Sequence, residues 1–378
     1  MRQLLPLRTS VAAATALLLA ACGSSPTAST GAAAAGSNGA AGEAATRAKE
    51  VYDRVNGLTG EQRRETLKEL AEKEGKLSIY TSNTDMDKLV EGFEDAYDIE
   101  VSVYRGNSES VLQRILQEQK AGYLGNDFVD TNAGELNILN AEGQLFPYEG
   151  ELRDKVREEG RARGWTASRF NVFVVGWNTD KVKDSEVPRT FEDLAGPQWK
   201  GRVSMEVGDV DWFAAMYKYH LDQGGSEAEV RDLFTRIAAN SKVAKGHTTQ
   251  GELLSAGQFG ITVSSYSHTV DKAADKGAPV TWHPASGPPI QPIVVRPNGV
   301  ALMRTATNPA AAMLFVDWEL TEGQKILADA FRIGSIPQGE DPLAGLRVIS
   351  VPEQELLDDP KKWDTLYADI LRSGQEIK

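Results

Sequence analysis

Residues 76–105, KLSIYTSNTDMDKLVEGFEDAYDIEVSVYR, contain the pattern that decides the fold. The mostly apolar run at 77–80 has the length of a strand, and Ile99 begins a second run in which apolar and polar residues alternate. Between the two runs, apolar side chains recur at helical spacing, with Met86, Leu89 and Phe93 on one face. This stretch therefore predicts a strand–helix–strand unit.

The same alternation continues along the chain. A helix is expected from Ser108, then a strand at 127–130 and a helix at 133–141. Later strands are expected at 170–177 and 259–263, and later helices at about 212–221, 227–239 and 308–320. Strands that alternate with helices indicate a parallel or mixed sheet covered by helices. We therefore expect an α/β fold.

The stretch GQFGITVSSYSH, residues 257–268, predicts a binding site at the end of a strand. Its apolar residues alternate up to Val263, and polar side chains follow directly, among them Ser265, Tyr266 and His268. In open α/β sheets, ligands bind beyond the carboxyl ends of strands, where helix N-termini also point. The plainer alternative is a strand end capped by serines and a tyrosine.

Composition excludes some classes of function. The chain has 378 residues, enough for two domains, and its formal net charge is -13. No basic stripe interleaved with aromatic residues occurs, so we expect no nucleic-acid partner. A single cysteine, Cys22, excludes an intramolecular disulfide.

The N-terminus has the features of an export signal. Arg2 and Arg8 precede an apolar core at 11–19, and Leu19-Ala-Ala-Cys22 supplies a small-residue cleavage pattern. A cysteine at this point resembles the lipobox of bacterial lipoproteins. We expect a signal peptide at 1–21, acylation of Cys22, a flexible tether at 22–58 rich in Ala, Gly and Ser, and an extracytoplasmic protein anchored to the cell membrane.

A lipobox, a tether and two halves rich in strand–helix units resemble the substrate-binding lipoprotein of an ABC importer. The segments at 76–81, 190–202, 257–261 and 308–312, with Gly323-Gln324, are similar to the ferric-iron-binding branch of these proteins. The resemblance covers about residues 76–378. It implies a two-lobed periplasmic-binding-protein fold, type II-like, in which each lobe is a mixed sheet flanked by helices and two crossovers form the hinge.

By this resemblance, lobe 1 would comprise residues 59–170 and 283–335, and lobe 2 residues 171–282 and 336–378. The protein would be a monomer that captures a small hydrophilic solute between its lobes. It would deliver that solute to an ABC permease and its ATPase. A ligand that contacts both walls favours the closed state.

The resemblance leaves the ligand open between ferric iron and an organic solute. Ferric-binding relatives supply two adjacent tyrosines, often with a histidine, a carboxylate and a bound anion. Here only Tyr266 is available, so a metal would be held by Tyr266, His268 and an acid such as Asp211, with Asp209 and Asp130 as alternatives. The relatives' anion loop is replaced by Gly208-Asp-Val-Asp-Trp212, whose acids would repel an anion. Fe(III) would then be cargo, and no cofactor is expected.

An organic solute would use another set of groups. Trp212 and Tyr266 would be apolar or cation–π walls, Asp211 a counter-charge, and Arg105 and Arg296 would hold an anionic end, which suits a zwitterion. The full predicted contact set is Ser82, Asn83, Arg105, Trp212, Thr248, Ser265, Tyr266 and Arg296. The plainer alternatives are a core position for Trp212 and helix capping for Asp211 and Thr248.

A secreted, lipid-anchored hydrolase is the rival interpretation. Gly-x-Ser-x-Gly, His-Glu-x-x-His, Gly-x-Gly-x-x-Gly and the Walker pattern do not occur, and the four histidines are scattered. We therefore expect a protein that is not an enzyme. A ligand-sensing protein would use the same cleft, and the sequence does not separate it from a transport protein.

Overall fold

The computed structural model describes residues 30–376. The predicted signal peptide and Cys22 lie outside the described residues. The helices are α1 Thr30–Asn56, α2 Gly60–Glu74, α3 Met86–Ala96, α4 Ser108–Ala121, α5 Ala133–Ala141, α6 Val210–Asp222, α7 Glu227–Asn240, α8 His247–Ser255, α9 Ser267–Asp275, α10 Pro309–Glu319, α11 Glu322–Asp329, α12 Glu353–Asp358 and α13 Pro360–Glu376. The strands are β1 Lys76–Thr81, β2 Glu100–Arg105, β3 Phe128–Asn132, β4 Leu145–Phe146, β5 Thr166–Asn178, β6 Val203–Glu206, β7 Ser241–Ala244, β8 Ile261–Tyr266, β9 Val280–Thr281, β10 Ile293–Met303, β11 Ile333–Gly334 and β12 Val348–Ser350.

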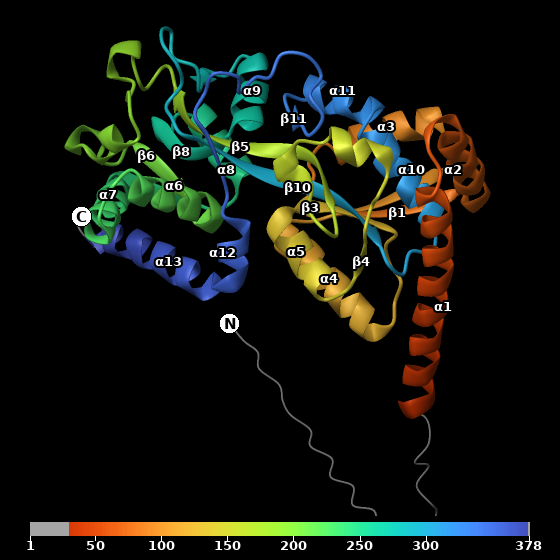
Figure 1. Ribbon diagram of the computed structural model, residues 1–378. Coiled ribbons are helices and arrows are strands. Elements are labelled where there is room, and N and C mark those ends of the chain that lie inside the picture. Colours follow the sequence, from red (N-terminus) through yellow and green to blue (C-terminus); the bar gives the residue numbers. More distant parts are fainter. Residues whose placement is uncertain (1–29, 377–378) are drawn as a thin grey trace, which may run out of the picture.

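The main strands form one continuous sheet in the order β2-β1-β3-β10-β5-β8-β6-β7. β1 pairs in parallel with β2 and β3 in one half, and β6 pairs in parallel with β7 and β8 in the other. Between them, the long strands β5 and β10 pair antiparallel to each other and pass from one half to the other. Figure 1 shows the two halves side by side, with β5 and β10 crossing between them. The predicted α/β fold is confirmed.

Helices cover each half of the sheet as the apolar spacing requires. On α3, Met86, Leu89 and Phe93 are buried, so the predicted helical face is the packed one. In the other half, α13 packs against α6 and α7, and Trp363 of α13 contributes to a second core cluster that is separate from the first. The boundary between the lobes that was predicted at residues 282/283 lies before the second crossing strand, β10, which begins at Ile293.

The predicted tether at 22–58 is wrong over most of its length, because residues 30–56 form the helix α1. Ala44, Ala48, Tyr52 and Val55 recur at helical spacing and are fully buried. The Tyr52 hydroxyl donates a hydrogen bond of 3.1 Å to the carbonyl of Met303. Alanine has the highest helix propensity, and its small side chain allows close packing, so an alanine-rich segment can form a docked helix.

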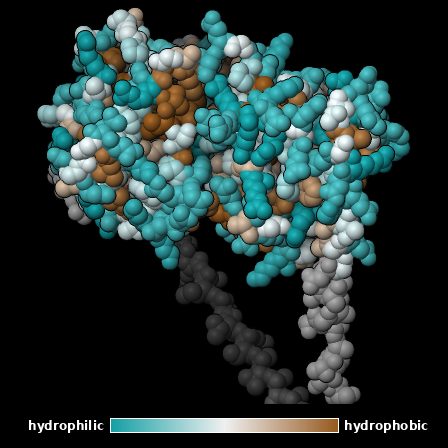
Figure 2. Space-filling view, in the orientation of Figure 1, coloured by the Kyte–Doolittle hydropathy of each residue, from teal (hydrophilic) through white to brown (hydrophobic). Residues whose placement is uncertain are grey.

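The surface is mostly hydrophilic on the face shown in Figure 2. Within residues 30–376, no helix combines the length and the apolar character needed to cross a bilayer.

Candidate functional site

A cavity of about 890 Å³ lies between the two halves of the sheet. This volume is within the range of small-molecule sites, about 300–1,000 Å³. The lining is formed by Ser82, Asn83, Thr84, Arg105, Gly106, Asn107, Ser108, Asn132, Arg169, Asn171, Gly246, His247, Thr248, Gly251, Glu252, Ser255, Ala256, Tyr266, His268, Thr269, Lys272, Ala273, Lys276, Asn298 and Arg332. Both halves of the sheet and both crossing strands therefore contribute to one site.

The topology explains why these residues meet. The cavity lies at the carboxyl ends of β1, β2 and β3 in one half and of β7 and β8 in the other. The first turns of α4, α8 and α9, which begin at Ser108, His247 and Ser267, border it or follow a lining residue directly. Backbone N–H groups in a first helical turn have no partner within their helix, and they favour anions.

The lining carries an excess of positive charge. Its cationic side chains are Arg105, Arg169, Lys272, Lys276 and Arg332, and its one carboxylate is Glu252. The chain as a whole has a formal net charge of -13, so this excess is local and does not follow from composition. A cleft with one sign of charge concentrates ligands of the opposite sign.

A buried ion network joins the two halves across the cavity. Asp85, in the turn between β1 and α3, accepts hydrogen bonds of 2.8 and 2.7 Å from Lys272 on α9 and of 2.9 Å from the Nε of Arg332. Burial opposes ionisation of Asp85, yet the cations Arg332 and Lys272 hold the pKa of this carboxyl below its usual value. Burial and the neighbouring Arg169 lower the pKa of Arg332 to about 10. Asp85 and Arg332 are therefore charged at neutral pH.

A second buried ion pair lies beneath the lining. Arg169 on β5 donates to both carboxylate oxygens of Asp130 on β3, at 2.8 and 3.0 Å. The exposed fractions are 1% for Arg169 and 0% for Asp130, so the pair is shielded from solvent. The Nε of Arg169 has no hydrogen-bond partner among residues 30–376, so one donor of this guanidinium is unpaired.

The predicted tyrosine is held from behind by Arg296. This guanidinium donates to the Tyr266 hydroxyl at 2.6 Å and also pairs with Asp211. Burial raises the pKa of Tyr266 well above its usual value, although Arg296 opposes the shift. The His247 ring stacks on the Tyr266 ring, with centroids 3.6 Å apart. The phenol therefore stays protonated, and Tyr266 forms part of the cavity wall.

Five of the predicted contact residues line the cavity: Ser82, Asn83, Arg105, Thr248 and Tyr266. The other three do not. The Trp212 indole is 2% exposed and packs in the second core cluster, because the first turn of α6 turns this side chain inward. Ser265 is fully buried on β8, and Arg296 supports Tyr266 from behind the lining.

The predicted metal set does not line the cavity as a whole. Asp211 is committed to Arg296, and only Tyr266 and His268 of the set line the cavity. Burial, and then the charges of Arg332 and Lys272, lower the pKa of His268 well below its usual value, so its imidazole is neutral. Each of the three acids considered for the ferric site is paired with another side chain: Asp211 with Arg296, Asp209 with His247 and Asp130 with Arg169.

Several lining residues have no local signal in the sequence. Arg169 and Asn298 lie on the crossing strands β5 and β10, within otherwise apolar runs, and Arg332 follows α11. Lys272 could have been found from its spacing, since it lies four residues after His268 on the same helix and so on the same face.

This fold and this cavity are those of a two-lobed binding protein, in which the ligand site lies between two halves of a sheet. A family model described as bacterial extracellular solute-binding protein matches residues 143–364, more than half of the chain. The chain belongs to this family. Its fold class and its role as the solute-binding protein of an ABC importer agree with the sequence-based predictions.

Similar proteins include iron uptake protein A1 of Synechocystis sp., which is 24% identical over 262 residues that cover 65% of this chain and 71% of the relative. Among solved structures, iron-bound HitA from Pseudomonas aeruginosa superposes with a TM-score of 0.64 at 20% identity, covering 78% of this chain and 99% of HitA. AfuA from Actinobacillus pleuropneumoniae, with fructose-6-phosphate bound, gives 0.65 at 21% identity, covering 79% and 99%. These structures share the fold, and the relatives that are named for a role are uptake or binding proteins.

Proposed function

We propose that this protein captures a small organic anion, such as a phosphorylated or carboxylated solute, in the cleft and delivers it to an ABC permease. The observation that carries the proposal is the charge of the lining. The lining holds the cations Arg105, Arg169, Lys272, Lys276 and Arg332 and one carboxylate, Glu252. The carboxylates of Asp85 and Asp130 lie behind it and pair with Lys272, Arg332 and Arg169, so the cations still outnumber the acids. Guanidinium groups bind phosphate and carboxylate through two parallel hydrogen bonds, which supplies both affinity and orientation.

Unused donors around the cavity support an oxygen-rich ligand. Asn83 Nδ2 and Arg169 Nε are buried donors of residues that line the cavity, and neither has a hydrogen-bond partner within residues 30–376. A buried polar atom without a partner costs about 1–3 kcal/mol, so an incoming acceptor recovers that energy. The hydroxyl and phosphate or carboxylate oxygens of a small anion would satisfy these donors.

Ferric iron is the second candidate, favoured by the uptake proteins to which the chain is similar. The site offers one phenol, Tyr266, which already accepts a hydrogen bond from Arg296. Fe(III) requires several hard anionic oxygens, and the lining supplies one carboxylate, Glu252. An iron complex with an organic anion would therefore suit this cleft better than the bare ion.

The remaining features of the proposal come from the sequence. We propose that residues 59–170 with 283–335 and residues 171–282 with 336–378 move as lobes, and that Cys22 carries a lipid anchor. We further propose that the protein acts as a monomer and binds without making or breaking a bond. The mature protein would then remain at the outer face of the membrane, where its permease is located.

A calorimetric titration tests the proposal directly. Fructose-6-phosphate, inorganic phosphate and a neutral hexose are each titrated into the protein, and binding is expected for an anion and not for the neutral sugar. Arg105→Ala should weaken that binding by about tenfold or more, since a charged hydrogen bond contributes about 1.5–3 kcal/mol. Arg64→Ala, at an exposed position on α2, is the matched control. Ferric salts added separately should give no phenolate–iron absorption band; a strong band would favour the iron interpretation.

A further inference from the structure

Three potential metal ligands meet immediately behind the lining of the second half. Glu206 is the last residue of β6, Asp209 directly precedes α6, and His247 is the first residue of α8. β6 and β7 pair in parallel, with Glu206 opposite Ala244, so the two turns that follow these strands lie next to each other. This register brings the three side chains together although they are up to 41 residues apart in sequence.

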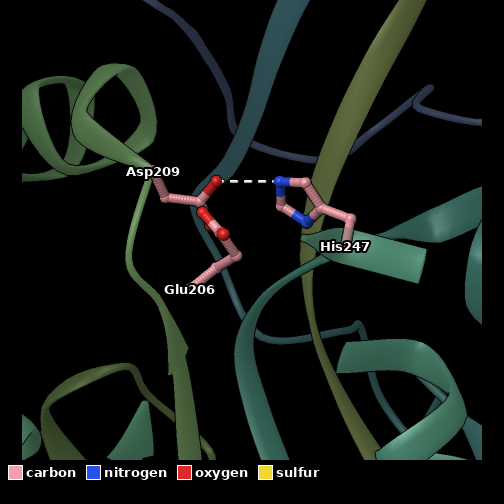
Figure 3. Close-up of side chains that lie close together, drawn as sticks. All are labelled: Glu206, Asp209 and His247. Atoms are coloured by element: carbon pink, nitrogen blue, oxygen red, sulfur yellow. Dashed lines mark ion pairs between the residues drawn. The ribbon is translucent and has the colours of Figure 1, made fainter. Parts of the chain in front are cut away.

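The three side chains point at a common volume, as Figure 3 shows. His247 Nε2 is 2.8 Å from an oxygen of Asp209, and one donor atom from each of the three residues lies within 4.8 Å of the other two. The Glu206 carboxylate is fixed by two backbone N–H groups, those of Gly208 at 2.5 Å and Gly246 at 2.6 Å. Gly246 has a φ of 87°, which glycine adopts without strain. The site is therefore held in place before any ligand arrives.

One oxygen in this group lacks a partner. Asp209 is 2% exposed, and its Oδ2 makes no hydrogen bond to any residue in the described range 30–376. Glu206, its carboxylate neighbour, is 5% exposed. Two buried carboxylates beside each other repel, and a neutral imidazole donates to only one of their oxygens. A cation bound among them would satisfy the unpaired oxygen and offset the repulsion.

We propose that Glu206, Asp209 and His247 form a resident site for a first-row divalent cation, of which Zn²⁺ is the best match. Two carboxylate oxygens and one imidazole nitrogen are a donor set typical of Zn²⁺, with bonds of about 2.0–2.2 Å. The cation would replace the hydrogen bond between Asp209 and His247. This site is separate from the cleft's cargo, since neither carboxylate lines the cavity.

The cation would also stiffen one wall of the cleft. His247 lines the cavity and stacks on Tyr266, so a bond from its Nε2 to the metal fixes the ring that the solute meets. A histidine that ligates a metal is usually oriented by groups that contact the rest of its ring. A bond to the metal restricts the orientation of the ring in turn. Loss of the cation should therefore loosen this wall while the fold of the lobe remains.

The test uses chelator-treated, untagged protein, with Zn²⁺ and Mn²⁺ titrated separately by calorimetry. One Zn²⁺ should bind per chain, and Asp209→Asn should weaken binding by at least about tenfold. Asp222→Asn, at an exposed carboxylate at the end of α6, should leave zinc binding unchanged. Because a variant can fail for structural reasons, crystals of the unaltered protein soaked in Zn²⁺ provide a second measurement. An anomalous peak between Glu206, Asp209 and His247 is expected. A peak elsewhere only, or binding that Asp209→Asn does not alter, would overturn the proposal and leave a plain hydrogen-bonded pair.

Discussion

Replacing Asp85 by asparagine removes the charge that joins the two halves of the sheet. The substitution keeps the shape of the side chain and one acceptor oxygen. In the unaltered protein, Lys272 and Arg332 both donate to the Asp85 carboxylate, at 2.7 and 2.9 Å. In the variant, both cations lose their counter-charge. Arg332 is 7% exposed, so solvent cannot replace its lost partner, whereas the Lys272 side chain is 25% exposed and keeps part of its solvation.

The magnitude follows from this geometry. Breaking a buried ion pair by removing one partner costs about 3–5 kcal/mol. Because typical domains are stable by about 5–15 kcal/mol, the variant should lose a large part of its stability. Asp87→Asn, at an exposed position two residues further on, should stay within about 0.5 kcal/mol of the unaltered protein.

Urea unfolding measures the difference, with the free energy extrapolated linearly to water and the slope expected to be similar for both proteins. The pKa of Asp85 is lowered in the folded state, so its stabilisation is present above the ordinary aspartate pKa of about 3.9 and is lost as the pH falls through the lower folded value. A loss below about 1 kcal/mol at pH 7 would refute the reasoning, since it would show that the network behaves as a solvated surface pair.

Two further predictions concern buried groups. Burial lowers the pKa of His268, so below pH about 6.5 the unfolded chain binds one more proton than the folded protein. The free energy of unfolding of the unaltered protein should therefore fall by up to about 1.4 kcal/mol for each unit by which the pH is lowered in this range. In His268→Gln this component should be absent when the pH dependence of the two proteins is compared. Parallel curves would contradict the burial of a neutral imidazole. Tyr52→Ala should cost about 3–5 kcal/mol and release α1 to rapid hydrogen exchange, whereas the exposed Glu50→Ala should not; slow exchange in α1 of the Tyr52 variant would show that the helix does not depend on this contact.

The fold could be predicted because its signals are local. The helical face of Met86, Leu89 and Phe93 is the buried face of α3. The alternating residues 259–263 form the start of the buried strand β8 and the two residues before it. The prediction of a flexible tether was wrong for a physical reason. Low apolar content predicts disorder only when small side chains have no surface to pack against, and α1 docks on α2 and α10.

The site was predictable mainly at strand ends and near the starts of the helices that follow them. Ser82, Arg105 and Tyr266 each stand at a strand end and line the cavity. Arg169 and Arg332 reach the cavity from a crossing strand and a late turn, and no spacing in the sequence relates them. Trp212 and Arg296 were predicted to contact the ligand and do not line the cavity. A helix start and a crossing strand each have one face toward the interior, and sequence alone does not show which side chains lie on it.

The identity of the molecule that the protein carries from its producing cells tests the central claim most directly. The purified protein is denatured, and its small-molecule and metal content is quantified by mass spectrometry. We predict about one equivalent of a small organic anion in the fraction that carries a ligand. Iron at one equivalent without an organic anion, or a neutral or cationic solute in that place, would contradict the assignment of this cleft to anions.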